Sequence, residues 1–79
     1  MEQQTVTYTI IMERAPGGDW NALVPDLPGL LLAGNTREEL LAAAPGAILD
    51  YLDVLLEDGE EIPRPASEAA QVTVTLPAA

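Results

Sequence analysis

Residues 24–40 read VPDLPGLLLAGNTREEL, and this stretch decides the fold. Pro25 has no backbone N–H, so it suits the end or the exposed edge of a strand. Residues 27–30 fit a type II turn, because Pro28 presets φ and Gly29 accepts positive φ. The stretch therefore predicts a strand, a tight turn, a second strand and then a helix.

A long helix is predicted over residues 37–57. Thr36 and Glu39 have the spacing of a capping box, in which a hydroxyl and a carboxylate each satisfy a free amide at the start of a helix. Gly59 is expected at the C′ position, just after the last helical turn. Apolar residues recur at spacings of three and four, which is typical of a helix with one buried face. The expected buried face consists of Leu41, Ala44, Ile48, Tyr51, Leu52 and Leu55.

Pro45 and Gly46 interrupt this helix. An interior proline removes one backbone hydrogen bond and crowds the preceding turn, at a cost of about 3 kcal/mol, and glycine adds about 1 kcal/mol. We therefore expect either one kinked helix or two helices, with Pro45 opening the second.

Four strands are expected around the helix. Residues 5–13 alternate with period two and predict a half-buried strand, which a hairpin turn at 15–18 joins to a second strand at 20–24. A third, more apolar strand is expected at 30–33. A last alternating stretch at 72–76 has to rejoin the sheet to bury its apolar face. The predicted fold is α+β: an antiparallel sheet in the order β-β-β-α-β, with one kinked helix packed on one face.

Leu23 breaks the alternation of its strand, and the strand that contains Leu31 is too apolar to have one solvated face. Both would lie on the sheet face that points away from the helix. One interpretation is an interface with a partner, and the other is a short strand buried on both faces.

The composition indicates one small domain over residues 1–79. A chain of this size hides only about 60% of the surface that its unfolded form exposes. The sequence contains no cysteine, so no disulfide can support the core. We therefore expect a homodimer or a larger homo-oligomer.

Thirteen carboxylates against three arginines give a formal charge of −10. Such a surface repels nucleic-acid phosphates and favours basic protein partners. The alternative is that the charge serves solubility or reflects the habitat of the source organism. The longest apolar runs are far shorter than a membrane span, and the first residues lack the features of a signal peptide, so a cytoplasmic protein without membrane contact is expected.

Catalytic chemistry has few candidates in this sequence. Without histidine or cysteine, nucleophilic triads and the usual zinc or redox sites are excluded. Glu13, Asp19 and Asp26 near strand ends could hold Mg²⁺, and a metal-dependent hydrolase is the third and last-ranked hypothesis. The simpler interpretation is that Asp26 bonds the amides of its own turn and that the other two are solvated. We therefore expect no enzyme activity, no catalytic residue, no metal and no cofactor.

Four acidic residues follow one another closely at the predicted end of the helix. The simpler interpretation is a solvated acidic turn, and the alternative is a docking site for a basic partner. This acidic cluster consists of Glu57, Asp58, Glu60 and Glu61.

The succession VPDLPG, a short apolar segment, GNT, EEL and the later DGEEIP resembles the HicB-like antitoxin family. The resemblance covers roughly residues 5–66. It implies a protein that binds and masks a small basic HicA-type toxin, an RNA-cleaving protein that acts on messenger RNA. Antitoxins of this family usually carry a C-terminal DNA-binding region. No such pattern is seen here, so direct DNA binding is not expected. The alternative function is a stand-alone, homo-oligomeric HicB-like binding module without a toxin partner.

Overall fold

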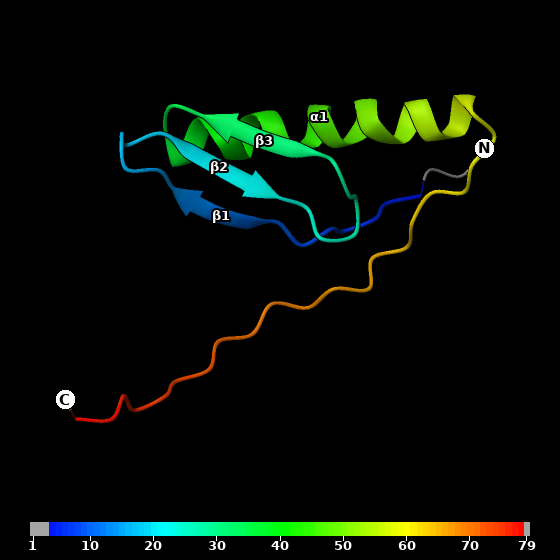
Figure 1. The fold of residues 1–79 in the computed structure, drawn as a ribbon. Coiled ribbons are helices and arrows are strands. Elements are labelled where there is room, and N and C mark those ends of the chain that lie inside the picture. The colour runs from blue at the N-terminus through cyan, green and yellow to red at the C-terminus, as the bar shows by residue number, and fades with distance from the viewer. Residues whose placement is uncertain (1–3, 79) are drawn as a thin grey trace.

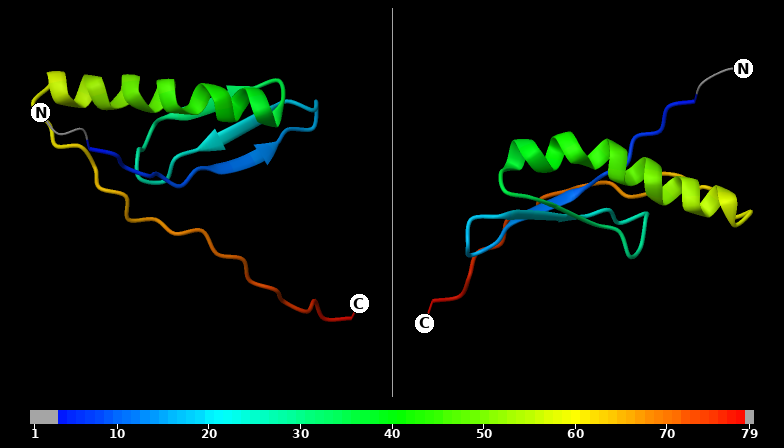
Figure 2. Two further views of the ribbon diagram at one scale, coloured as in Figure 1. Left: turned by 180° about the vertical axis from the view of Figure 1, so that it is seen from behind. Right: turned by 90° about the horizontal axis from the view of Figure 1, so that it is seen from above.

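The computed structural model describes residues 4–78 and has an α+β architecture. Three short strands form one antiparallel sheet in the order β1-β2-β3, and a single helix covers one face of it (Figure 1). The view from above in Figure 2 shows these two layers separately. The elements are β1 (Ile11–Arg14), β2 (Trp20–Leu23), β3 (Leu31–Gly34) and α1 (Arg37–Glu57).

The sheet is shorter at its first strand than the alternation of residues 5–13 predicts. β1 pairs with β2 in the register Ile11 opposite Leu23, and pairing starts there. The position before Ile11 would face Val24, after which Pro25 turns the chain away. Residues 5–10 therefore lack a partner strand, and strand pairing needs one.

Two consecutive β-turns fold the chain around Leu27, which is fully buried. The Leu27 amide donates to the Val24 carbonyl at 2.9 Å, and the Leu30 amide donates to the Leu27 carbonyl at 3.3 Å. Gly29 has a φ of +87°, so the second turn has the positive φ predicted for it. The sequence did not reveal the first turn, in which Pro25 occupies the position that favours proline.

The residues predicted to cap the two ends of α1 are confirmed. The Thr36 hydroxyl accepts a hydrogen bond from the Glu39 amide at 3.1 Å. The Glu39 carboxylate reaches back to the amide of Asn35, at 3.0 Å, one residue before the cap. Gly59 has a φ of +76° and donates to Leu56, while the next amide donates to Leu55, which makes a Schellman motif.

Pro45 lies inside one uninterrupted helix. The alternative of two helices is therefore wrong, because α1 runs through this position in both views (Figures 1 and 2). Pro45 is exposed, so the carbonyl that loses its partner lies on the solvent side of the helix. The kink itself stays a prediction. No helix within residues 4–78 is long and apolar enough to cross a membrane.

The core lies between α1 and the sheet. Leu40 is fully buried, whereas Leu41 is 39% exposed, so the predicted buried face was wrong at its first position. The sequence pattern does not distinguish these two adjacent leucines. The orientation of α1 on β3 determines which of them is buried. The buried hydrophobic residues are Ala22, Val24, Leu27, Leu32, Leu40, Ala44 and Leu52.

The chain after the helix forms no further helix or strand within the described residues. The prediction that residues 72–76 rejoin this sheet is therefore wrong for the chain on its own. Residues 68–78, here called the extended segment, leave the body beyond the β1 edge (Figures 1 and 2). The radius of gyration of 15.9 Å reflects this departure, because a compact domain of this length has about 12 Å.

Candidate partner-binding surfaces

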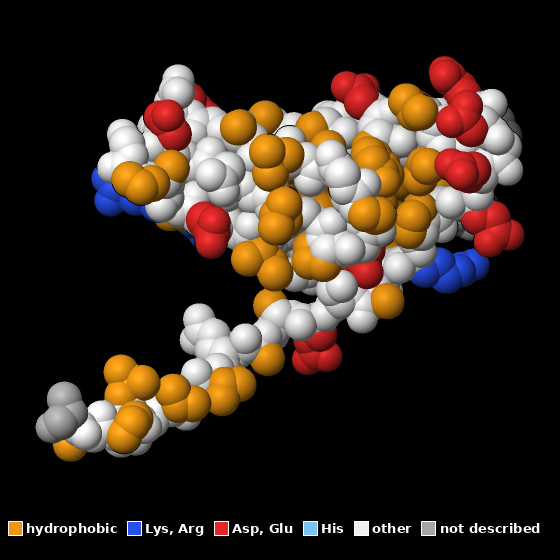
Figure 3. All heavy atoms as spheres, in the orientation of Figure 1, with side chains coloured by type: hydrophobic (Ala, Val, Ile, Leu, Met, Phe, Trp, Pro, Cys, Tyr) orange, Lys and Arg blue, Asp and Glu red, His pale blue; other side chains and the backbone are white. Residues whose placement is uncertain are grey.

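The sheet face that points away from α1 carries a row of three exposed apolar side chains, here called the apolar row. Ile11 lies opposite Leu23, and Leu23 lies opposite Leu31, so the row crosses all three strands. Their exposed fractions are 52%, 59% and 66%. Exposure on this face excludes the alternative of a strand buried on both sides. Figure 3 shows hydrophobic side chains spread over the sheet on this face.

Ile11 was not singled out from the sequence. It directly follows Ile10, and an alternation of period two assigns only one of two adjacent isoleucines to the core. The pairing register identifies Ile11 as the outward one, because its partner Leu23 is exposed while the neighbouring pair of Met12 and Ala22 faces the helix.

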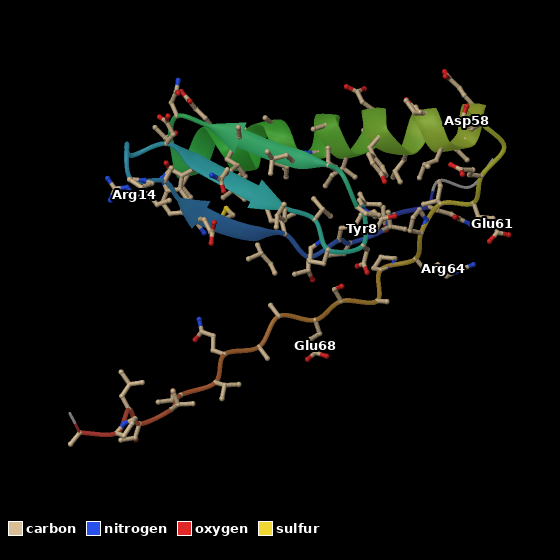
Figure 4. The ribbon with its side chains drawn as sticks, viewed as in Figure 1. Tyr8, Arg14, Asp58, Glu61, Arg64 and Glu68 are labelled. Atoms are coloured by element: carbon tan, nitrogen blue, oxygen red, sulfur yellow. The ribbon has the colours of Figure 1, made fainter. Side chains whose placement is uncertain are left out.

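The acidic cluster lies at the C-terminal end of α1, around the last turn of the helix and its Schellman motif. All four side chains are exposed. Figure 3 shows the acidic side chains gathered at this end, and Figure 4 places Asp58 and Glu61 there. The structure therefore does not bring this cluster together with Leu23 and Leu31.

The acidic cluster is unfavourable for the helix that carries it. The C-terminal end of a helix has a partial negative charge that favours cations. The last turn of α1 contains no basic residue. Carboxylates at this position lower the stability of the helix by a small amount, which an approaching positive charge would recover.

A groove of ≈ 490 Å³ adjoins the acidic cluster and shares Glu61 with it. One wall is the second half of α1, where Leu49 and Leu56 are exposed, and the other wall is the segment 61–65. Asp53 adds a second carboxylate to its lining, and Val6 adds an apolar side chain. The groove is mainly apolar, and its charged lining residues are Asp53, Glu61 and Arg64. Leu49 and Leu56 are seven residues apart, and this spacing was the signal in the sequence that could have indicated a second apolar face.

Asp26 holds the chain after the helix, not its own turn. Its carboxylate accepts hydrogen bonds from the Ala66 amide at 3.1 Å, from the Ser67 amide at 3.2 Å and from the Ser67 hydroxyl at 3.0 Å. The prediction that Asp26 bonds the amides of its own turn is therefore wrong. The two β-turns around Leu27 satisfy their amides with backbone carbonyls, which leaves this carboxylate available.

Two further side chains complete this contact. The Tyr8 hydroxyl donates to the Pro63 carbonyl at 2.6 Å, and the Thr9 hydroxyl donates to the Ser67 carbonyl at 3.2 Å. Figure 4 shows Tyr8 close to where the chain after α1 passes the sheet. We call the contact of Tyr8, Thr9 and Asp26 with residues 63–67 the segment anchor.

The segment anchor shifts the pKa of two groups in opposite directions. The hydrogen bond from the Ala66 amide, helped by both groups of Ser67, lowers the pKa of Asp26, although partial burial opposes this. Burial raises the pKa of Tyr8, and the nearby charge of Asp26 raises it further. At neutral pH the anchor therefore combines an ionised carboxylate with a protonated phenol.

The carboxylates considered for Mg²⁺ are not assembled into a metal site. Within residues 4–78 no three acidic side chains are placed so that they could hold a metal ion together. Asp26 is committed to residues 66 and 67, while Glu13 and Asp19 are exposed near the first hairpin.

Comparison with known proteins gives a consistent set of relatives. The sequence profile of a family described as "HicB_like antitoxin of bacterial toxin-antitoxin system" matches residues 8–77. Antitoxin HicB 2 of Photorhabdus laumondii is 36% identical over 75 residues, which are 95% of this chain and 52% of that protein. A UPF0150 protein of Thermoplasma acidophilum is 36% identical over 85% of this chain and 94% of its own length. Antitoxin HicB of Escherichia coli K12 is 36% identical over 75% of this chain. The chain spans about half the length of the HicB antitoxins that it matches, 52% and 43% in these two cases.

Proposed function

Because this chain belongs to the HicB-like antitoxin family of bacterial toxin–antitoxin systems, we propose that it binds and masks a small basic toxin of the HicA type. Masking requires a complementary surface and no chemical step, so no residue is assigned a catalytic role. A cytoplasmic location, where such a toxin would meet messenger RNA, is part of this proposal.

The acidic cluster beside the apolar groove supports this proposal best. A toxin that cleaves RNA needs a basic surface to hold phosphates. The acidic cluster offers carboxylates to that surface, and the groove beside it offers Leu49 and Leu56 for apolar contact. A buried apolar centre with a charged rim is the usual anatomy of a specific protein interface.

The net charge of −10 acts at longer range than these contacts. Opposite charges steer two proteins together and raise the rate of association, and this effect weakens as salt screens the charges. Binding of the proposed toxin should therefore have an association rate that falls steeply with ionic strength. Duplex DNA, which is a polyanion, should not bind and serves as the negative control ligand.

The partner is tested by a pull-down from the native host, followed by a growth-rescue assay with each small basic protein recovered. A protein that arrests growth when expressed alone, and is neutralised by co-expression of this chain, supports the proposal. Recovery of nothing but copies of this chain contradicts it. The alternative function, a stand-alone homo-oligomeric HicB-like module, would then be adopted.

The binding surface is tested with two matched variants that each remove four negative charges. One carries Glu57→Gln, Asp58→Asn, Glu60→Gln and Glu61→Gln. The control carries Glu13→Gln, Asp19→Asn, Glu38→Gln and Asp50→Asn. We expect the first variant to slow association at least about tenfold more than the control at low salt, with a smaller effect on dissociation. Equal rates for the two variants would show that overall charge, and not this surface, carries the binding.

A further inference from the structure

We propose that the extended segment adds as an extra strand to the β1 edge of a second copy of this chain, and that the two copies exchange these strands reciprocally. This inference is independent of the toxin partner, because it uses only contacts and surfaces of the chain itself.

The extended segment has the sequence pattern of a strand, but it pairs with no strand in the described part of the chain. Val72, Val74 and Leu76 alternate with threonines, and their exposed fractions are 84%, 72% and 81%. No backbone hydrogen bond to residues 68–78 is found within the described part of the chain. Alternating apolar side chains next to unpaired backbone groups are the features with which a peptide adds to a sheet edge.

The chain's own sheet cannot cover all three of these side chains. The Thr9 hydroxyl binds the Ser67 carbonyl, so the segment anchor sets residue 67 beside residue 9. Continued along β1 from this point, residue 72 would reach Arg14, where β1 ends. Val74 and Leu76 would then lie beyond the sheet, next to the hairpin at 15–18. A second copy is needed to bury them.

The β1 edge offers the matching surface. The strand order β1-β2-β3 leaves one side of β1 without a neighbour. α1 packs mainly on β3 and less on β2, so the helix-facing side of β1 is incompletely covered and Met12 is only half-buried. A strand added to this edge would place its alternate side chains beside Met12 and extend the core.

Charge also favours a second copy as the partner. Residues 69–78 contain no charged side chain in a chain whose net charge is −10. β1 carries Glu13 and Arg14, which cancel each other. The two surfaces can therefore meet without the like-charge repulsion that opposes contact elsewhere on two acidic molecules. Natural edge strands that must stay unpaired usually carry charges, and the extended segment carries none after Glu68.

The proposal is tested on the full chain by sedimentation and by hydrogen exchange of the amides in residues 71–76. We expect a dimer with these amides protected. A monomer with protected amides would mean that the segment closes on its own sheet. A dimer with unprotected amides would place the interface elsewhere, for example on the apolar row. A monomer with unprotected amides would also overturn the proposal.

Two single substitutions distinguish a paired strand from a segment that associates only through non-specific apolar contacts. Val74→Asp and Thr75→Asp add the same charge at adjacent positions, but on opposite faces of the strand. Because Val74 is largely exposed in the single chain, its replacement leaves the fold intact, which circular dichroism verifies. We expect Val74→Asp to raise the dimer dissociation constant at least about a hundredfold, and Thr75→Asp to change it less than about fivefold. Equal effects would contradict the strand geometry.

The exchange of strands between two copies is tested by mixed isotope labelling. A sample that mixes one copy labelled at methionine methyls with another labelled at valine methyls reports only contacts between copies. We expect contacts from Met12 to Val72 or Val74. Their absence in a dimeric sample would overturn the assignment of β1 as the receiving edge.

Discussion

Asp26 and Ser67 are joined by two hydrogen bonds across 41 positions of sequence, from the Ser67 amide at 3.2 Å and from its hydroxyl at 3.0 Å. The stretch that shapes the two β-turns thus also holds the chain that follows the helix. Through this contact, the VPDLPG loop sets the point at which the extended segment leaves the body.

The first prediction concerns the pH dependence of this contact. The folded-state pKa of Asp26 is below the ordinary value of 3.8. A carboxyl with a depressed pKa contributes stability that is fully present above the ordinary pKa and is lost as the pH falls through the folded-state value. We therefore expect the amide resonances of Ala66 and Ser67 to titrate together with a midpoint below 3.8. The anchor should be intact at neutral pH.

Asp26→Asn supplies the control for this titration. The amide side chain still has an oxygen acceptor but no charge, so the two resonances should lose their acid titration while the sheet stays folded. A midpoint at or above 3.8 in the unmodified chain would contradict the assignment of the hydrogen bonds to an ionised Asp26.

The second prediction compares two glycines at which an added Cβ has equal space but whose backbone φ angles differ. A Cβ added at Gly29 or at Gly46 meets nothing within 4 Å, but Gly29 has a φ of +87°. Gly29→Ala should destabilise by about 1–2 kcal/mol through backbone strain alone. Gly46→Ala, inside α1, should stabilise by about 0.5–1 kcal/mol. Chemical denaturation measures both, and effects of the same sign would mean that the turn has been assigned wrongly.

The third prediction concerns the close approach of β3 to the start of α1. A Cβ at Gly34 would lie 2.6 Å from the backbone nitrogen of Leu40, which is too close for any real contact. Since Leu40 is fully buried and its backbone is helical, neither side can yield easily. Gly34→Ala should therefore destabilise by about 2–3 kcal/mol.

Gly17→Ala is the matched control, because a Cβ there meets nothing within 4 Å and its φ lies outside the left-handed region. Its effect should stay within about 0.5 kcal/mol. If both variants unfold at the same denaturant concentration, the helix start is able to move away from β3, and the tight packing is not required for the fold.

The parts of the fold that depend on local chemistry could be predicted from the sequence. Gly29 and Gly59 sit at positive φ where the turn and the helix stop require them, and Thr36 caps α1 as expected. Each of these features involves residues within a few positions of each other. The propensities that decide them are therefore fully contained in a short stretch of sequence.

The features that were missed depend on contacts between distant residues. Nothing near Asp26 in the sequence indicates that Ser67 is its partner, and the choice of Leu40 over Leu41 follows from how the helix lies on β3. The alternation at Val72 and Val74 indicates a propensity for a strand, but it does not identify a neighbouring strand, and residues 72–76 form no strand in the described chain. The partner of a strand is determined by the tertiary structure and not by the period of the strand's hydrophobic pattern.

The last prediction concerns Pro45, which α1 contains without interruption. Replacing it with alanine restores an amide that can donate to the Leu41 carbonyl and removes the clash with the preceding turn. Because both residues are exposed, the new side chain disturbs no packing. We expect Pro45→Ala to stabilise by about 1–3 kcal/mol, or about 4–8 °C in Tm for each kcal/mol in a domain of this size.

Pro16→Ala in the first hairpin tests whether this gain belongs to the helix interior. Pro16 lies in a turn, where its ring restricts the unfolded chain without breaking a helical hydrogen bond, so its replacement should destabilise by about 0.4–1 kcal/mol. Opposite signs for the two variants are the expected result. A loss of stability in Pro45→Ala would mean that the packing of α1 on β3 depends on a bend at this proline, and the kink predicted from the sequence would then be a required part of the fold.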